Sequence, residues 1–275
     1  MSHQLDNPLN ADAMRAKYGP WALIAGASEG TGAEFARQLA ALGLNCVLVA
    51  RRPEPLQRVS AEIRSDYSVE TRVLTLDLCA EDAAERMRAA VADLEIGLYV
   101  SNAGADSSGM RFLDAPLDKW HGLLNMNVRT VMDAVYFFAS AMKSRGRGGV
   151  LLMSSGAALG GQPRLAMYSG TKAFEVNFAE SLWAELKAYG IDVVSIAAPA
   201  MDTPVLRAAL KRKNLTADQL IQPADVVRIA LAELSAGPTY VFPLDPSQSA
   251  QELNAARRAR LLQVTEITKL FFGSE

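Results

Sequence analysis

The chain has 275 residues, of which 50% are hydrophobic and 21% are charged, a composition typical of one globular domain and unlike disordered, collagen-like or coiled-coil chains. Its 28 basic and 30 acidic residues nearly cancel, so the overall charge predicts no binding to nucleic acid or to an anionic membrane surface. Cys46, Cys79, His3 and His121 are the only cysteines and histidines. They are too few for a disulfide framework or a structural zinc site, and we expect no bound metal.

The N-terminal segment and the hydropathy of the chain predict its location in the cell. Asp6 and Asp12 lie in an N-terminal segment without a basic stretch followed by an apolar one, so we expect no signal peptide and a cytoplasmic protein. No run of about 18 apolar residues occurs. The longest uncharged stretch, residues 148–163, is interrupted by Gly, Ser and Gln, and we therefore expect no membrane span.

Short β-branched segments alternate with longer segments of helical spacing from Trp21 onward, which is typical of βαβ units. The expected strands are residues 21–26, 45–50, 71–77, 96–101, 149–154, 192–198 and 240–243. They predict an α/β fold with a doubly wound parallel sheet of about seven strands in a single domain. The expected organisation is an N-terminal arm (1–19), a main domain (20–245) with a substrate flap (about 199–220), and a C-terminal helical extension (246–275).

Two later helical segments, about 117–143 and 168–188, are apolar on every side. Such helices need cover on both faces. The sheet covers one face, and a second copy of the chain is the simplest cover for the other, which predicts a homodimer or homotetramer. The alternative cover is the C-terminal helix expected over about 247–271.

A glycine-rich segment follows the first expected strand. Residues 26–32 read Gly-Ala-Ser-Glu-Gly-Thr-Gly, and helical spacing begins directly after them. Glycines allow positive φ and close approach of backbone N–H groups to a pyrophosphate, and a helix N-terminus adds favourable partial charge. The segment predicts a dinucleotide site, although a tight strand-to-helix turn alone also needs glycine.

The end of the second expected strand bears on which dinucleotide binds. An acidic residue usually stands there to hold the ribose 2′-OH, but this chain has Ala50, Arg51 and Arg52. Guanidinium groups bind a 2′-phosphate bidentately, so we predict NADP(H). The alternatives are that both arginines lie on a solvated loop, or that Glu29 or Glu54 turns inward and weakens this preference.

Three polar side chains stand where they can meet. Tyr168 and Lys172 are four residues apart in a helical segment, so one helix face presents both. Ser155 precedes them at the expected carboxyl end of a strand, where open α/β sheets bind ligands. We expect the three side chains to converge there.

In these motifs and their order, the chain strongly resembles the short-chain dehydrogenase/reductase family over roughly residues 20–245, which implies a Rossmann fold. The family's glycine motif falls on Gly26, Gly30 and Gly32, its adenine-contacting Asp on Asp77, and its Asn-Ala-Gly segment on residues 102–104; its catalytic tetrad falls on Asn127, Ser155, Tyr168 and Lys172. The resemblance implies that the cofactor is held by Gly26, Ser28, Gly30, Thr31, Gly32, Arg51, Arg52, Asp77, Leu78, Asn102, Gly104, Tyr168, Lys172, Pro199 and Thr203.

The resemblance also implies the roles of the tetrad. Tyr168 is expected to act as general acid in reduction and as base in oxidation, and Ser155 to hydrogen-bond the carbonyl oxygen. Asn127 is expected to hold a water that links Lys172 to solvent. The segment 19–22 resembles, more weakly, the branch that contains 3-oxoacyl-CoA and 17β-hydroxysteroid reductases.

Three residues depart from the family pattern. Ala25 replaces the usual Thr before the glycine motif, Ser101 replaces the first of two Asn after the fourth strand, and Ala200 replaces Gly in the Pro-Gly that follows the sixth. We expect Ala200 to reshape the loop over the nicotinamide and to move Thr203, the expected carboxamide contact.

The flap suggests the substrate class. Its apolar residues follow an amphipathic pattern with basic residues opposite: Met201, Val205, Leu206 and Leu210 against Arg207, Lys211, Arg212 and Lys213. An apolar floor suits an acyl chain or a sterol, and the basic residues either attract an acidic carrier such as CoA or form a solvated face. We predict an NADP(H)-dependent oxidoreductase for a hydrophobic carbonyl or alcohol compound. The alternatives are an NAD-linked alcohol dehydrogenase and a catalytically silent, NADP-sensing regulatory protein.

Overall fold

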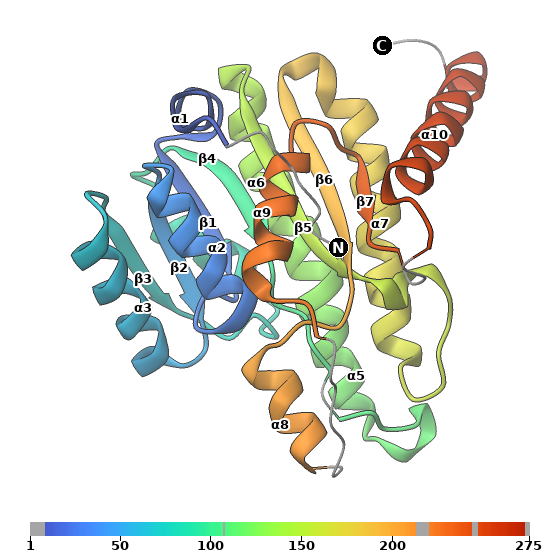
Figure 1. Ribbon diagram of the computed structural model, residues 1–275, viewed down its shortest axis with the longest axis horizontal. Helices are drawn as coiled ribbons and strands as arrows, with labels where there is room; N and C mark the ends of the chain where they lie inside the picture. The colour runs from blue at the N-terminus through green and yellow to red at the C-terminus, as the bar shows by residue number, and fades with distance from the viewer. Residues whose placement is uncertain (1–8, 107, 213–219, 244–246, 273–275) are drawn as a thin grey trace.

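The computed structural model describes residues 9–106, 108–212, 220–243 and 247–272, and a seven-stranded parallel sheet forms its centre. The strands are β1 (Trp21–Ala25), β2 (Asn45–Ala50), β3 (Thr71–Thr75), β4 (Ile96–Ser101), β5 (Gly148–Ser155), β6 (Ile191–Ala198) and β7 (Thr239–Val241). Their order is β3-β2-β1-β4-β5-β6-β7, which reverses direction beside β1 and makes the sheet doubly wound (Figure 1). The predicted fold class is confirmed, and each expected strand lies within two residues of the observed one.

Helices cover both faces of the sheet, because successive side chains along each buried strand point to opposite sides. Leu23 of β1 packs with one set of helices and Ile24 with the other. The Ile24 side holds α1 (Ala11–Tyr18), α2 (Gly30–Ala41), α3 (Pro53–Asp66) and α9 (Pro223–Glu233). The Leu23 side holds α4 (Ala83–Ala90), α6 (Thr130–Arg145) and α7 (Ala166–Leu186).

The remaining elements lie at the borders of these layers. They are α5 (Leu117–Leu124), α8 (Pro204–Arg212), α10 (Ala250–Phe272) and the short turns η1 (Phe112–Asp114), η3 (Gly156–Leu159) and η4 (Lys187–Tyr189). Helices α5 and α8 follow β4 and β6 and extend beyond the lower edge of the sheet in Figure 1. No helix in the described ranges is long and apolar enough to cross a membrane.

The segment before β1 is folded onto the domain. Helix α1 packs against β4 and β5, and its last residue, Tyr18, is buried and donates a hydrogen bond to Asp192 Oδ2 at 2.7 Å. Within the expected N-terminal arm, residues 11–18 therefore form part of the domain's packed structure.

The helical segment expected over 117–143 is interrupted. Between α5 and α6 the chain forms a π-helical turn, η2 (Asn125–Arg129), which a pattern of apolar residues does not distinguish from α-helix. Helix α6 is also not covered all round, because Tyr136 on its outer face is 71% exposed.

The C-terminal helix lies against α7, the second of the two apolar segments. Helix α10 packs on β7, its Arg257 pairs with Glu180 of α7, and Arg258 lies over the ring of Trp183. Beyond these contacts α10 leans away from the body of the molecule (Figure 1). The outer face of α6 around Tyr136 is thus left without cover in the described chain.

Candidate active site

The glycine turn after β1 is closed against the loop after β4. Gly26 has φ of +91°, and a Cβ there would lie 2.7 Å from the Ala103 backbone nitrogen. A Cβ on Gly32 would lie 1.9 Å from the Gly26 carbonyl oxygen, which itself accepts a hydrogen bond from Asn102 Nδ2 at 3.1 Å. Glycine is required at both positions because other backbone atoms occupy the space of a side chain.

The other side of this turn faces the flap. Gly30 begins α2 with φ of +55°, and a Cβ on it would lie 3.3 Å from Thr203 Cγ2. The buried Thr31 hydroxyl contacts Met201 Sδ at 3.5 Å. Ser28 in the turn is half-buried, and so is Pro199 directly after β6. The glycine turn, the N-terminus of α2 and the loop that carries Thr203 therefore lie next to one another. A pyrophosphate-binding site needs such an arrangement, because it requires exposed backbone N–H groups at a helix N-terminus.

The two arginines after β2 differ in their partners, because Arg52 forms an ion pair and Arg51 does not among the described residues. Arg52 Nη2 lies 2.6 Å from Glu29 Oε1, and hydrogen bonding to this carboxylate raises the pKa of Arg52. Arg51 is exposed, and no carboxylate of the described residues pairs with it. Ala50 is buried, so Arg51 is the unpaired cation of the described chain at the carboxyl end of β2.

The segment after β3 lies beside these arginines. Exposed Asp77 accepts a hydrogen bond from the Cys79 backbone at 3.0 Å, and Leu78 is buried. The Arg51 charge acts on Cys79 and opposes the burial that raises the pKa of this thiol. The expected adenine-side residues therefore gather at the carboxyl ends of β2 and β3.

Asn127, Tyr168 and Lys172 are linked around Thr171. Asn127 is fully buried in η2 and donates through Nδ2 to Thr171 Oγ1 at 2.9 Å. Thr171 in turn donates to the Tyr168 carbonyl at 3.0 Å. A Cβ on Gly104 would lie 2.7 Å from Lys172 Nζ and 2.8 Å from Asn127 Oδ1, so both polar groups converge on this glycine.

Helix α7 is attached to the carboxyl end of β5. Lys172 Nζ donates to the Met153 carbonyl at 2.7 Å, and the Ser154 hydroxyl donates to the Lys172 carbonyl at 2.8 Å. Ser155, the last residue of β5, accepts a hydrogen bond from the Ala157 backbone through Oγ at 3.2 Å. The four expected catalytic residues therefore surround this strand end, although no hydrogen bond in the described chain joins the Ser155 and Tyr168 hydroxyls.

The structure adds a charged residue that the sequence reasoning missed. Glu175 is 1% exposed, and both its carboxylate oxygens accept hydrogen bonds from Lys172 Nζ at 2.9 Å. Burial raises the pKa of Glu175 to about 7, and the Lys172 charge opposes this rise. The spacing of the residues could have identified Glu175. It follows Lys172 by three residues, and Lys172 follows Tyr168 by four, so all three share one helix face.

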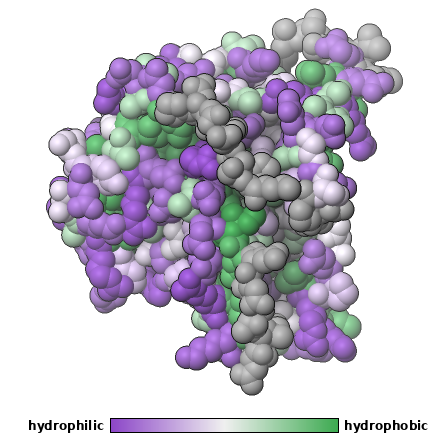
Figure 2. Space-filling model, in the orientation of Figure 1, coloured by the Kyte–Doolittle hydropathy of each residue, from purple (hydrophilic) through white to green (hydrophobic). Residues whose placement is uncertain are grey.

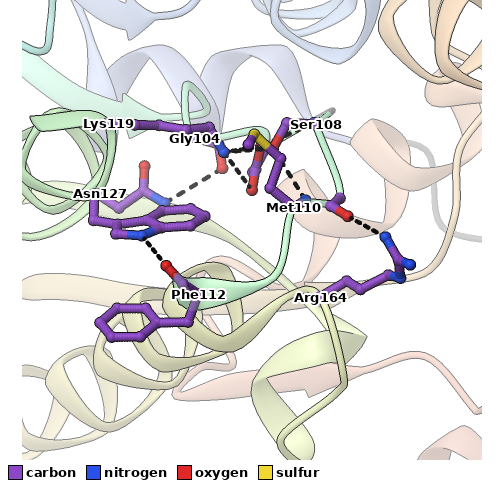
Figure 3. A network of polar contacts seen from close by, with 10 residues as sticks. Gly104, Ser108, Met110, Phe112, Lys119, Asn127 and Arg164 are labelled. Atoms are coloured by element: carbon purple, nitrogen blue, oxygen red, sulfur yellow. Dashed lines mark hydrogen bonds and ion pairs between the residues drawn. The ribbon is translucent and has the colours of Figure 1, made fainter. Parts of the chain in front are cut away.

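The loop that follows Gly104 is held by a polar network that continues from the Asn127–Gly104 hydrogen bond (Figure 3). Lys119 of α5 contacts Asp106 Oδ1 at 3.1 Å and the Ser108 hydroxyl. Arg164, in the loop before α7, donates to the Gly109 carbonyl at 3.2 Å. These contacts link the loops after β4 and β5 to each other and to α5.

The flap is amphipathic as expected but its charges are partly paired. In α8, Val205 is 37% exposed, and Arg207 pairs with Asp202. The side chain of Arg212 and the whole of Lys213 lie outside the described residues. Figure 2 shows an apolar strip between polar side chains in the lower half of this face, near α8.

Comparison with characterised proteins gives consistent matches. A 7beta-hydroxysteroid dehydrogenase of Collinsella aerofaciens is 35% identical over 197 residues, which are 72% of this chain and 74% of that protein. A very-long-chain 3-oxoacyl-CoA reductase of Meyerozyma guilliermondii is 38% identical over 196 residues, 68% of this chain and 58% of the reductase. The chain thus spans less than two thirds of the reductase's length.

Solved structures share the fold. One, from work on 7beta-hydroxysteroid dehydrogenase stereoselectivity, has a TM-score of 0.76 at 31% identity and covers 84% of this chain and 90% of its own. A short-chain dehydrogenase from Sphingobium yanoikuyae in complex with NADPH has a TM-score of 0.78 at 24% identity, with coverage of 90% and 95%. The family model described as short chain dehydrogenase matches residues 20–214. With this match, the doubly wound sheet and the glycine turn together, the chain belongs to the short-chain dehydrogenase family of oxidoreductases.

Proposed function

We propose that the protein interconverts a hydrophobic ketone and its alcohol with NADP(H), using Tyr168 as general acid and base. The observation that carries this proposal is the attachment of the Tyr168–Lys172 face of α7 to the end of β5. The Lys172–Met153 and Asn127–Thr171 hydrogen bonds fix that face. Preorganised polar groups of this kind are what proton transfer to a developing alkoxide needs.

Each residue has a defined part in the proposed reaction. In reduction, Tyr168 gives its hydroxyl proton to the carbonyl oxygen while the Ser155 hydroxyl donates a hydrogen bond to the same oxygen. In oxidation, Tyr168 takes this proton back. The cofactor, when bound, supplies or accepts the hydride at the carbonyl carbon. Lys172 supplies a positive charge one helical turn from Tyr168, and Asn127, whose Oδ1 has no hydrogen-bond partner among the described residues, holds a water that connects the site to solvent.

The charges after β2 support NADP(H) as the cofactor. Arg51 is free to contact a 2′-phosphate, and position 50 carries alanine where a carboxylate would select NAD. The Arg52–Glu29 pair is the observation that favours the NAD-linked alternative, because it neutralises one of the two cations. Direct comparison of both cofactors separates the two assignments.

The flap and the relatives support a bulky apolar substrate. Helix α8 presents Val205, and Leu159 after β5 is 42% exposed. The similar proteins act, by name, on a 7β-hydroxysteroid and on very-long-chain 3-oxoacyl-CoA. We therefore propose a steroid-like or 3-oxoacyl ketone as the substrate, and a homo-oligomer in which α6 meets its copy.

The test is a panel of ketosteroids, 3-oxoacyl thioesters and small ketones, scored by loss of NADPH or NADH absorbance. The proposal expects turnover with at least one large apolar ketone, faster with NADPH, and none with the Tyr168→Phe variant. Tight NADPH binding without turnover across the panel would contradict it and favour a regulatory protein. Turnover with NADH alone would overturn only the cofactor assignment.

A further inference from the structure

A buried carboxylate lies on the same face of α7 as the proposed general acid. Glu175 is 1% exposed and Lys172 is 2% exposed, so the two form a desolvated ion pair. The Lys172 ammonium makes three hydrogen bonds to protein groups, two to the Glu175 carboxylate and one to the Met153 carbonyl. The carboxylate therefore determines both where this ammonium sits and how much net charge it carries.

The groups around Glu175 come from three elements. On its own helix it meets Lys172, and Tyr168 stands one turn further back on the same face. From β4 comes the fully buried Tyr99, whose pKa is raised by burial and further by the Glu175 charge. From β5 comes only the Met153 carbonyl, bound to Lys172. Lys172 is the one cation that contacts Glu175 in the described chain.

Fold stability does not explain this arrangement. Two charges lose their hydration when they are buried as a pair, and apolar residues of similar volume usually stabilise a core as well or better. Glu175 also sits close to the proposed general acid, because the Lys172 ammonium that it binds stands one helical turn from Tyr168 on the same face of α7. A negative charge bound to that ammonium offsets its positive charge.

We propose that Glu175 is a positioning residue that holds the Lys172 ammonium against β5 and offsets its charge, so that Tyr168 keeps its proton to higher pH. This inference rests on the proposed function. The effect applies to both directions of the reaction, because a catalyst does not change the equilibrium between ketone and alcohol.

Burial sets the pH range in which this effect operates. Because burial raises the pKa of Glu175 to about 7, the carboxylate is charged mainly above that pH and mainly neutral below it. The wild type and a variant with a neutral residue at 175 should therefore behave alike in mild acid and differ in the alkaline range, where alcohol oxidation is measured.

The decisive measurement follows the ionisation of Tyr168 directly. Cofactor-free protein carrying 13Cζ-labelled tyrosine is titrated by NMR, with the Tyr168 resonance identified by its loss in Tyr168→Phe. Glu175→Gln is expected to lower the ionisation midpoint of Tyr168 by about 0.5–1 pH unit. The alkaline limb of alcohol oxidation should move by the same amount, a rise of about threefold to tenfold in rate below the midpoint.

The matched control is Glu180→Gln. Glu180 is a second shielded carboxylate on α7, paired with Arg257 and accepting a hydrogen bond from Thr239, and its loss should leave the Tyr168 midpoint unchanged. Glu175→Asp keeps the charge and should restore a midpoint close to that of the wild type. If Glu175→Gln does not fold, Glu175→Met removes the charge with a side chain of similar length.

The possible outcomes separate this inference from the proposed function. An unchanged Tyr168 midpoint in Glu175→Gln overturns the role of Glu175, even if the wild type reduces ketones. A wild type without ketone turnover overturns the proposed function, and the NMR titration still decides whether Glu175 acts on Tyr168. Equal shifts in Glu175→Gln and Glu180→Gln would indicate a general loss of packing in α7 and would also overturn the inference.

Discussion

Tyr168 is the residue on which the proposed chemistry depends most. Tyr168→Phe keeps the aromatic ring and removes the transferable proton, so kcat should fall by about 100-fold or more while NADPH binding stays largely intact. Steady-state kinetics and a fluorescence titration with NADPH measure the two effects. Tyr136→Phe, on the 71% exposed Tyr136 of α6, is the control. If the Tyr168→Phe variant kept more than about a tenth of wild-type kcat, Tyr168 would be excluded as the acid.

Arg51 is the residue that should set cofactor choice. A desolvated, charge-assisted contact to the 2′-phosphate contributes about 1.5–3 kcal/mol, which corresponds to a preference for NADPH of roughly 10-fold to 150-fold in Kd. Arg51→Ala should remove most of this preference, and Ala50→Asp should reverse it. Calorimetric titration with both cofactors measures the ratio, and high salt should reduce it. Equal wild-type affinities would refute the NADP assignment.

Glu29 offers an independent test of the same site. It pairs with Arg52 and would lie near a bound phosphate of like charge. Glu29→Gln should free Arg52 and strengthen NADPH binding, by no more than about fivefold because both side chains are partly exposed. NADH binding serves as the control and should change little. A weaker NADPH affinity in this variant would show that Glu29 positions Arg52 for the phosphate.

At the scale of elements, the glycine turn depends on close backbone contact with α2. A Cβ on Gly32 would lie 1.9 Å from the Gly26 carbonyl oxygen, so Gly32→Ala must displace the turn. Such overpacking costs about 1–3 kcal/mol or more, or roughly 3–10 °C in Tm, and NADPH binding should be lost. Gly122→Ala in α5 is the control, since its Cβ would meet nothing nearer than 3.9 Å. Equal melting temperatures for the two variants would contradict the claim that backbone contact excludes a side chain at Gly32.

The π-helical turn η2 is the other element that shapes the site. A π-turn inserts one residue into a helix and changes the direction of its side chains. Here it directs fully buried Asn127 toward Thr171 and Gly104. The site thus depends on a local irregularity between two regular helices.

At the scale of the whole molecule, the uncovered face of α5 and α6 predicts self-association. Leu117 is 60% exposed and Tyr136 71%, and a large apolar surface of this kind is usually buried against a partner. Light scattering should give at least twice the chain mass of 29.6 kDa, and Tyr136→Glu should lower it. Leu262→Glu on α10 is the control for the other exposed helix. A wild-type mass of one chain at micromolar concentration would contradict the assembly.

The buried carboxyl of Glu175 should also affect global stability. Burial raises its pKa from an ordinary 4.5 to about 7, so between these values the folded state binds more protons than the unfolded state. Stability contributed by this group is therefore present below pH 4.5 and lost as pH rises through about 7, by about 3 kcal/mol. Urea unfolding at a series of pH values should show this decline in the wild type and not in Glu175→Gln. Parallel pH profiles of the two proteins would contradict it.

The strands of the sheet and the order of the motifs could be predicted from the amino-acid sequence. Strand positions follow from alternating or continuous runs of apolar residues, which are local sequence patterns. The glycine segment and the Tyr168–Lys172 spacing are local patterns as well. Only the tertiary structure decided which charges meet. The Arg52–Glu29 pair joins residues on two different βα loops. The burial that raises the pKa of Glu175 arises where α7 packs against β5 and β6. Long-range pairing and burial depend on how distant segments pack together, and no local pattern encodes them.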